Sequence, residues 1–193
     1  MLTLLFFGLL SFYSVDQPER AWILPAAFWL FLAASIGDWL DGYLARKLGQ
    51  TTVFGRVVDP VVDKVMVCGA FVYFCGTPFY DAATQQSITG VAPWMAVVVL
   101  LRELFVSAIR AFSESQGTNF SAVWVGKIKM TVQAATVCIV LGVLAWFEDT
   151  LAWLRITAVW LTVIVTALSI ITYARRVRAT VFSAAAMGSE PRP

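Results

Sequence analysis

The chain has 193 residues, of which 60% are hydrophobic and only 13% are charged, and its mean hydropathy is +0.78. A soluble domain carries roughly 25% charged residues, so this composition indicates an integral membrane protein. The net charge of +2 is too small to indicate a nucleic-acid partner.

Five segments are approximately long enough to cross a bilayer, for which a helix needs about 20 mainly apolar residues. They are residues 21–39, 57–79, 91–112, 128–147 and 151–173. Residues 1–14 are also apolar but too short to span. Because they lack the basic region and the cleavage site of a signal peptide, we interpret them as the outer part of a first helix whose beginning is missing.

The sequence therefore predicts an all-α, polytopic membrane protein with six transmembrane helices, the first of them truncated. We expect one transmembrane domain over residues 1–178. A short cytoplasmic tail over residues 179–193 would follow, and its polar composition predicts disorder.

The basic residues are distributed unevenly between the two sides that six spans would create. One side receives Arg46, Lys47, Arg56, Lys64, Arg110, Lys127, Lys129, Arg175, Arg176 and Arg178. The other side receives only Arg20 and Arg155, beside several acidic residues. Because cytoplasmic loops carry an excess of Lys and Arg, we expect the first side to face the cytoplasm.

Histidine is absent from the sequence, so a general base would have to be a carboxylate, Lys, Tyr or Cys. The three cysteines, Cys68, Cys75 and Cys138, lie in apolar runs and show no C-x-x-C spacing. We interpret them as small hydrophobic residues rather than as disulfide partners or metal ligands.

The stretch DWLDGYLARKLGQTTVFGRVVDPVVDK contains four aspartates in a chain that otherwise avoids charge. Asp38 and Asp41 lie near the end of the second predicted helix, and Asp59 and Asp63 lie at the start of the third. Spacings of three and four place side chains on one helical face, so two such pairs on antiparallel helices can converge. If Pro60 is the first residue of its helix, Asp59 becomes the N-cap and the face argument weakens for that pair.

Four carboxylates packed together repel one another in a medium of low dielectric, and divalent cations remove that repulsion. Oxygen ligands favour Mg²⁺, Mn²⁺ or Ca²⁺, and two metals in such a cluster can clamp a diphosphate. In the alternative interpretation, the aspartates cap helices and pair with Arg46, Arg56 and Lys64. Acidic residues are costly at a membrane edge, which favours the functional role.

A divalent-cation transporter would also use carboxylates within a membrane. Such a transporter is expected to hold its acidic residues near the bilayer midplane, on broken helices. Here the acidic residues lie at one interface beside basic residues, so we keep the transporter as a remote alternative.

Small residues accompany the aspartates. Gly42 and Ala45 lie on the same turns as Asp38 and Asp41 and would let a ligand approach the backbone closely. Gly49 is expected to end a helix. Gly55 is either a turn residue or a second site of close ligand approach.

These residues together resemble the full signature of the CDP-alcohol phosphatidyltransferases, in the pattern Asp38-x2-Asp41-Gly42-x2-Ala45-Arg46-x8-Gly55-x3-Asp59-x3-Asp63. The stretch RELFVSAIRAFSESQGTNFSAVWVGKIKMTVQ is similar to the corresponding part of bacterial phosphatidylglycerophosphate synthases. Overall the resemblance covers most of the chain from about residue 33 onward and is weakest in the last two helices. The sequence departs from the family at its beginning, where an amphipathic segment and a first helix with nucleotide-binding residues are missing.

The resemblance implies the CDP-alcohol phosphotransferase fold and transfer of a phosphatidyl group from CDP-diacylglycerol to an alcohol, with release of CMP. By the family pattern, Asp38, Asp41, Asp59 and Asp63 hold two divalent ions, Mg²⁺ or Mn²⁺, and Asp63 is the general base. The same pattern assigns nucleotide and diphosphate binding to Gly42, Ala45, Arg46, Thr52 and Gly55, although Thr52 is as well suited to cap a turn. It also implies a homodimer in the bacterial cytoplasmic membrane, with its active site facing the cytoplasm.

The acceptor alcohol is inferred from four cations on the cytoplasmic side of the fourth and fifth predicted helices, Arg102, Arg110, Lys127 and Lys129. A phosphorylated acceptor needs such a cluster, which favours sn-glycerol 3-phosphate and leaves inositol phosphate and phosphatidylglycerol as alternatives.

The excess of basic residues on the cytoplasmic side is by itself enough to explain Lys127 and Lys129. Arg102 lies too deep in an apolar run for that explanation. Adjacent positions point to different helical faces, so we do not expect Arg102 and Glu103 to pair with each other. We expect Glu103 to orient a basic neighbour instead.

Overall fold

The computed structural model describes the backbone of residues 2–48, 53–82, 84–115, 124–148 and 150–187. Within these ranges, it leaves the side chains of some helical residues undescribed: residues 39, 42, 43, 45, 46, 48, 53–63, 110, 112–115, 124–128 and 172–187. Structural statements below refer to the described residues.

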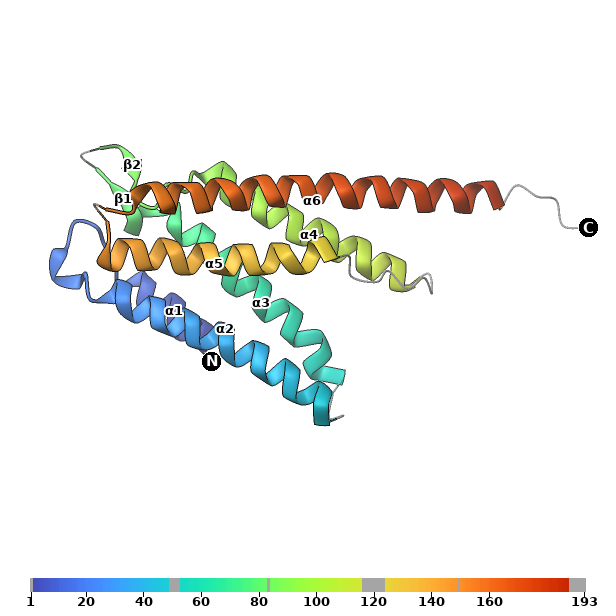
Figure 1. Ribbon diagram of the computed structural model, residues 1–193, viewed down its shortest axis with the longest axis horizontal. Coiled ribbons are helices and arrows are strands. Elements are labelled where there is room, and N and C mark those ends of the chain that lie inside the picture. Colours follow the sequence, from blue (N-terminus) through green and yellow to red (C-terminus); the bar gives the residue numbers. More distant parts are fainter. Residues whose placement is uncertain (1, 49–52, 83, 116–123, 149, 188–193) are drawn as a thin grey trace, which may run out of the picture.

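Six α-helices dominate the described chain and confirm the predicted all-α architecture (Figure 1). They are α1 (Leu2–Ser11), α2 (Ile23–Leu48), α3 (Val53–Phe74), α4 (Pro93–Ser115), α5 (Trp124–Trp146) and α6 (Ala152–Met187). Short elements connect them: the 3-10 turns η1 (Pro18–Arg20) and η2 (Thr77–Phe79), and the strands β1 (Tyr80–Asp81) and β2 (Gln86–Ser87). The two strands form one antiparallel hairpin between α3 and α4.

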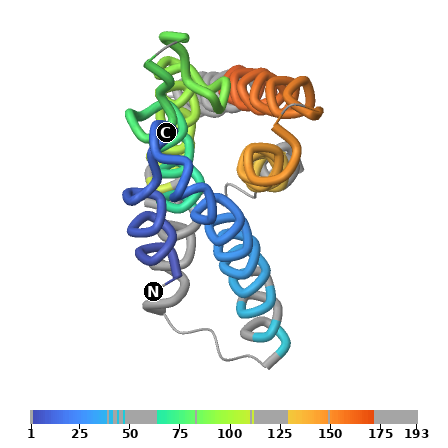
Figure 2. The backbone as a smooth tube through the Cα atoms, turned by 90° about the vertical axis from the view of Figure 1, so that its left-hand side faces the viewer, coloured from blue at the N-terminus to red at the C-terminus, as the bar shows by residue number. Residues whose placement is uncertain are grey.

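The helices pack side by side in a closed order, α1, α2, α5, α6, α4 and α3, with α3 returning to α1 and also touching α5. Figure 2 shows this ring end-on. The hairpin, η1 and the connection from α5 to α6 gather at one end of the molecule, and the C-terminal end of α2 and the N-terminal end of α3 lie toward the other (Figure 1). The aspartate motif therefore lies at the end opposite the hairpin.

Three stretches are long and apolar enough to cross a membrane, Pro18–Asp38, Lys129–Trp146 and Ala152–Ile171, and they coincide with three of the five predicted spans. Two shorter apolar helices, Leu2–Ser11 and Lys64–Phe74, accompany them in the described ranges. The chain is thus an all-α membrane protein.

Aromatic side chains fill the core near the hairpin end. Phe6, Phe31, Phe71, Phe74 and Phe79 are each 0% exposed and join α1, α2, α3 and η2. Adjacent rings meet in tilted or edge-on pairs, such as Phe6 with Phe31 at 5.4 Å and Phe74 with Phe79 at 5.5 Å between ring centroids. This rigid cluster anchors the three helices far from the aspartate motif.

The structure decides two points about helix ends. The helix α3 begins at Val53, so Pro60 lies in its interior and the condition under which Asp59 would be an N-cap is not met. Asp59 and Asp63 therefore lie four residues apart on one face of a continuous helix. The helix α6 continues through Arg178 to Met187, so the predicted disorder does not hold over that stretch. Gly49, expected to end a helix, lies outside the described residues.

Candidate functional site

A cavity of about 390 Å³ opens between α2, α3, α4 and α5 beside the aspartate motif. Its charged lining residues are Asp38 from α2, Lys64 from α3, Glu103 from α4 and Lys129 from α5. Apolar side chains such as Leu32, Met66 and Ala134 line the rest. The cavity therefore places one member of the acidic motif and a set of buried charges around a common space.

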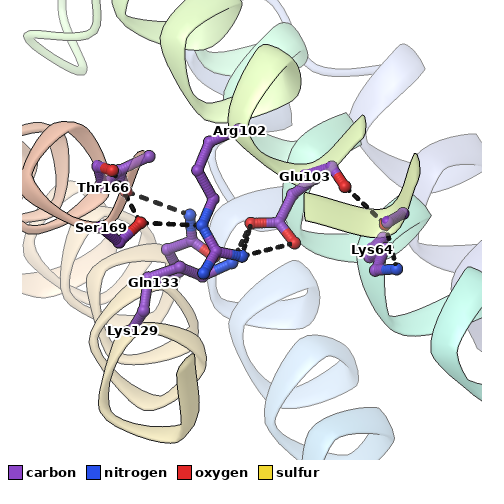
Figure 3. A network of polar contacts seen from close by, with 8 residues as sticks. Lys64, Arg102, Glu103, Lys129, Gln133, Thr166 and Ser169 are labelled. Atoms are coloured by element: carbon purple, nitrogen blue, oxygen red, sulfur yellow. Dashed lines mark hydrogen bonds and ion pairs between the residues drawn. The ribbon is translucent and has the colours of Figure 1, made fainter. Parts of the chain in front are cut away.

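Glu103 is the centre of the buried charges (Figure 3). Its carboxylate accepts hydrogen bonds from Lys129 Nζ and from Arg102 Nη1, the latter at 3.2 Å to Oε1 and 3.4 Å to Oε2. Arg102 is 4% exposed, Glu103 7% and Lys129 1%. Ionised groups so thoroughly removed from water are stable only when they are paired and hydrogen-bonded, which these contacts provide.

The contact between Arg102 and Glu103 corrects the expectation that adjacent residues cannot pair. Their Cα–Cβ bonds do diverge around α4, but both side chains are long and bend toward the same interior space. Spacing rules for helix surfaces assume side chains that extend into solvent. In a buried site, the need to pair each charge decides the rotamers instead.

Arg102 is also held from α6. Its Nε donates to Ser169 Oγ at 2.8 Å, and Ser169 Oγ donates to the main-chain oxygen of Thr166 at 2.8 Å. Glu103 and Lys129 line the cavity, whereas Arg102 does not. The guanidinium supports the cavity wall through its contact with Glu103.

A third cation lies on the other side of Glu103. Lys64 Nζ donates to Ser107 Oγ at 2.6 Å, and Ser107 Oγ donates to the main-chain oxygen of Glu103 at 2.5 Å. Lys64, Arg102 and Lys129 thus gather around Glu103, and the last two share its carboxylate. Cations in a medium of low dielectric attract an anion strongly.

The seam between α5 and α6 continues the polar contacts into the apolar interior. Gln133 Nε2 donates to Thr166 Oγ1 at 3.3 Å, and the hydroxyls of Thr136 and Thr162 lie 2.7 Å apart. These residues are at most 2% exposed. Hydrogen bonds of this kind join neighbouring helices in membranes, where lipid offers polar groups no alternative partner.

The predicted metal ligands lie on two helices. Asp38 and Asp41 are exposed on α2, and Asp59 and Asp63 lie on α3, their side chains outside the described part. Asp41 precedes the end of α2 by seven residues and Asp59 follows the start of α3 by six, so both pairs lie toward the same end of the molecule (Figure 1). Both helices run without a break through the motif, unlike the broken helices expected of a transporter.

Carboxylates are the donors that Mg²⁺ and Mn²⁺ prefer, and carboxylates at three- and four-residue spacing fit such ions. Among the described side chains, no group of three or more metal-ligating residues occurs, since only two of the four aspartates are described there. The chemistry of the donor set therefore fits divalent ions.

The other predicted site residues are placed by their helices alone. Gly42, Ala45 and Arg46 lie on α2, Gly55 on α3, Arg110 on α4 and Lys127 on α5, with side chains outside the described part. Thr52 lies outside the described residues altogether. Of the four predicted acceptor-binding cations, the structure thus brings together the side chains of Arg102 and Lys129.

Sequence reasoning did not assign a role to Ser107, Gln133, Thr166 or Ser169, and it considered Lys64 only as a basic residue of the cytoplasmic side and a partner for the aspartates. Lys64 was a weak signal because it directly follows Asp63. A stronger signal was available on α6, where Thr162, Thr166 and Ser169 recur at spacings of four and three within an apolar span. Polar residues on one face of a membrane helix mark a face that is buried in protein.

Comparison with known proteins identifies the family of the chain. The family model for CDP-alcohol phosphatidyltransferase matches residues 1–170. A cardiolipin synthase (CMP-forming) from Oryza sativa subsp. japonica is 38% identical over 136 residues, which are 66% of this chain and 40% of the relative.

Two bacterial relatives carry the name CDP-diacylglycerol–glycerol-3-phosphate 3-phosphatidyltransferase. The protein from Haemophilus influenzae is 39% identical over 119 residues, 61% of this chain and 57% of the relative. The protein from Escherichia coli K12 is 34% identical over 122 residues, 62% of each chain. This chain spans about half the length of the curated relatives it matches. Because the family model covers most of its length, the chain belongs to the CDP-alcohol phosphatidyltransferase family.

Proposed function

We propose that the protein transfers the phosphatidyl group of CDP-diacylglycerol to sn-glycerol 3-phosphate, giving phosphatidylglycerophosphate and CMP. The observation that carries this proposal is the cavity shared by Asp38 of the acidic motif and Lys129 of the buried cationic network. One wall suits a metal-bound diphosphate and the other suits the phosphate of an acceptor. The names of the Haemophilus influenzae and Escherichia coli relatives describe the same reaction.

Members of this family generally depend on divalent metal ions. We propose that Asp38, Asp41, Asp59 and Asp63 hold two of them, Mg²⁺ or Mn²⁺. When bound, such ions neutralise charge on the leaving phosphate of CMP and polarise the phosphorus that is attacked.

The protein's own side chains would orient the reactants and move the proton. Asp63 would accept the proton of the acceptor hydroxyl as its oxygen bonds to the phosphatidyl phosphorus and the bond to CMP breaks. We propose nucleotide and diphosphate binding by residues of α2, α3 and their connection, namely Gly42, Ala45, Arg46, Thr52 and Gly55. Small residues there let the nucleotide approach the α2 backbone closely.

The acceptor phosphate would bind the cations of α4 and α5, Arg102, Arg110, Lys127 and Lys129. Among the two whose side chains are described, Lys129 lines the cavity and is the direct candidate, and Arg102 adds positive charge from behind it. A phosphate dianion would pair with these cations. A neutral acceptor would make no such charge pair.

The basic residues favour a cytoplasmic position for this end of the molecule. We propose that the protein lies in the bacterial cytoplasmic membrane as a homodimer, with its active site facing the cytoplasm. This placement suits the donor, because the acyl tails of CDP-diacylglycerol stay in lipid while its nucleotide stays in water.

A second acceptor is favoured by one comparison. The Oryza sativa relative is named cardiolipin synthase (CMP-forming), which describes the same leaving group with a different product. Phosphatidylglycerol, a phosphodiester with one negative charge, would then replace glycerol 3-phosphate. Inositol phosphate is the remaining phosphorylated alternative.

A competition assay tests the proposal. Purified protein receives CDP-diacylglycerol, Mn²⁺ and radiolabelled glycerol 3-phosphate, with unlabelled phosphatidylglycerol or inositol phosphate as competitor. We expect labelled phosphatidylglycerophosphate that neither competitor suppresses at equal concentration. If phosphatidylglycerol suppresses the labelled product and cardiolipin forms instead, phosphatidylglycerol is the acceptor.

A further inference from the structure

The structure contains a chain of contacts that leads from α6 to the cavity. Ser169 on α6 contacts Arg102, Arg102 contacts Glu103, and Glu103 contacts Lys129, whose side chain lines the cavity (Figure 3). Three helices contribute to this chain, and none of its first three members is more than 7% exposed. Ser169 is fully buried, at 0% exposure.

The hydroxyl of Ser169 has a fixed orientation. It donates its proton to the main-chain oxygen of Thr166, so its lone pairs are available to accept from Arg102 Nε. An acceptor for the Nε proton fixes the plane of the guanidinium group. That plane in turn directs Nη1 at both carboxylate oxygens of Glu103.

The position of Lys129 depends on the same geometry. Its ammonium group is a compact charge on a flexible stem and has no preferred direction of its own. Here Glu103 Oε1 receives it while also accepting from Arg102. If Arg102 rotates, Glu103 loses its contact with the guanidinium. The carboxylate can then move, and the ammonium group of Lys129 moves with it.

We infer that Ser169 is a positioning residue for the acceptor site, acting through Arg102 and Glu103 on Lys129. This inference rests on the proposed function, because it takes the acceptor phosphate to bind at Lys129. It extends the site to α6, a helix that contributes no residue to the described cavity wall.

A merely structural role for Ser169 is the competing explanation, since interhelical hydroxyls also hold membrane helices together. The chain provides a matched control for it. Thr162 lies two turns earlier on the same face of α6, is also 0% exposed, and bonds to Thr136 of α5. Among the described residues, its hydroxyl bonds to Thr136 and not to Arg102, Glu103 or Lys129.

The experiment compares Ser169→Ala with Thr162→Val in the full chain. For each, kcat and KM are measured for glycerol 3-phosphate and for CDP-diacylglycerol, and calorimetry measures glycerol 3-phosphate binding. We expect Ser169→Ala to raise the KM and Kd of glycerol 3-phosphate about tenfold, because a hydrogen bond to a charged group is lost. Thr162→Val should leave both within about twofold, and neither variant should change the KM of CDP-diacylglycerol appreciably.

Three further variants keep the inference falsifiable if Ser169→Ala folds poorly. Ser169→Cys preserves the size of the side chain with a weaker acceptor and should raise the same KM. Ser169→Thr retains the hydroxyl and should restore it. Arg102→Lys removes the Nε donor of this hydrogen bond. The double variant with Ser169→Ala should therefore have an acceptor KM close to that of Arg102→Lys alone.

Equal acceptor KM values in Ser169→Ala and Thr162→Val would overturn the inference and leave Ser169 a helix contact. Measurements on the wild-type protein test the proposed function separately. A wild-type protein that neither binds nor turns over glycerol 3-phosphate would overturn the proposed function and, with it, the inference.

Discussion

Replacing Glu103 by Gln should destabilise the protein severely, because it removes the negative charge between two buried cations while preserving the shape of the side chain. Arg102 and Lys129 are 4% and 1% exposed, so water cannot compensate for the lost charge. Breaking a buried ion pair by removing one partner costs about 3–5 kcal/mol. The amide oxygen of Gln still accepts one hydrogen bond, so we expect a loss near the lower limit, about 3 kcal/mol of the free energy of unfolding.

The measurement is equilibrium unfolding of the purified protein in mixed micelles, followed by circular dichroism. Glu19→Gln provides the control, since Glu19 is an exposed acid on η1 and its loss should cost no more than about 0.5 kcal/mol. The double variant Glu103→Gln with Lys129→Met should recover part of the stability, because it also removes one of the uncompensated cations. Equal stabilities of Glu103→Gln and Glu19→Gln would refute the reasoning, as would a double variant whose loss is the sum of two large single losses.

Three further predictions concern the reaction and the opposite end of the molecule. Asp63→Asn should abolish turnover while divalent-metal binding, followed by calorimetry, persists at least in part, because the proton acceptor is lost but the other carboxylates remain; normal turnover would exclude Asp63 as the base. Arg110→Ala should raise the KM of the acceptor more than that of CDP-diacylglycerol in steady-state assays, because a phosphate contact is lost; an unchanged acceptor KM would argue against that contact. Burial, reinforced by the nearby charge of Glu148, raises the pKa of Tyr13 from 10.0 to about 12. A raised pKa means that the stabilising contribution is fully present below pH 10 and is lost as the pH rises toward 12, by up to about 1.4 kcal/mol per pH unit. Between pH 9 and 12, the melting temperature of Tyr13→Phe should therefore fall less steeply with pH than that of the wild type. The control Tyr80→Phe, at an exposed tyrosine, should show the pH dependence of the wild type.

The six helices were predictable because hydropathy and length identify apolar helices strongly. The residues at which the helices begin and end were less predictable. The polar composition after Arg178 indicated disorder, yet α6 continues to Met187, since a helix with satisfied backbone hydrogen bonds can extend beyond its apolar part. The sequence left open whether α3 begins at Pro60; the helix begins at Val53, because a proline can also lie inside a helix at the cost of one hydrogen bond.

The metal-binding role of the acidic motif stays a prediction, because the side chains of Asp59 and Asp63 lie outside the described part. The buried network was predictable only in part. Arg102 and Lys129 were identified as unusual cations, but the contact between Arg102 and Glu103 depends on side-chain rotamers in a buried space. The contact with Ser169 depends on how α6 packs against α4, which no local pattern of sequence specifies.

The most direct test of the account is the transferase reaction itself, measured as two products at once. Purified protein is incubated with CDP-diacylglycerol and glycerol 3-phosphate, and CMP and phosphatidylglycerophosphate are quantified with EDTA, with Mg²⁺ and with Mn²⁺. We predict equal molar amounts of the two products, no reaction with EDTA, and no CMP release when glycerol 3-phosphate is omitted. CMP release that does not depend on the acceptor, or product formation that persists in EDTA, would contradict the account.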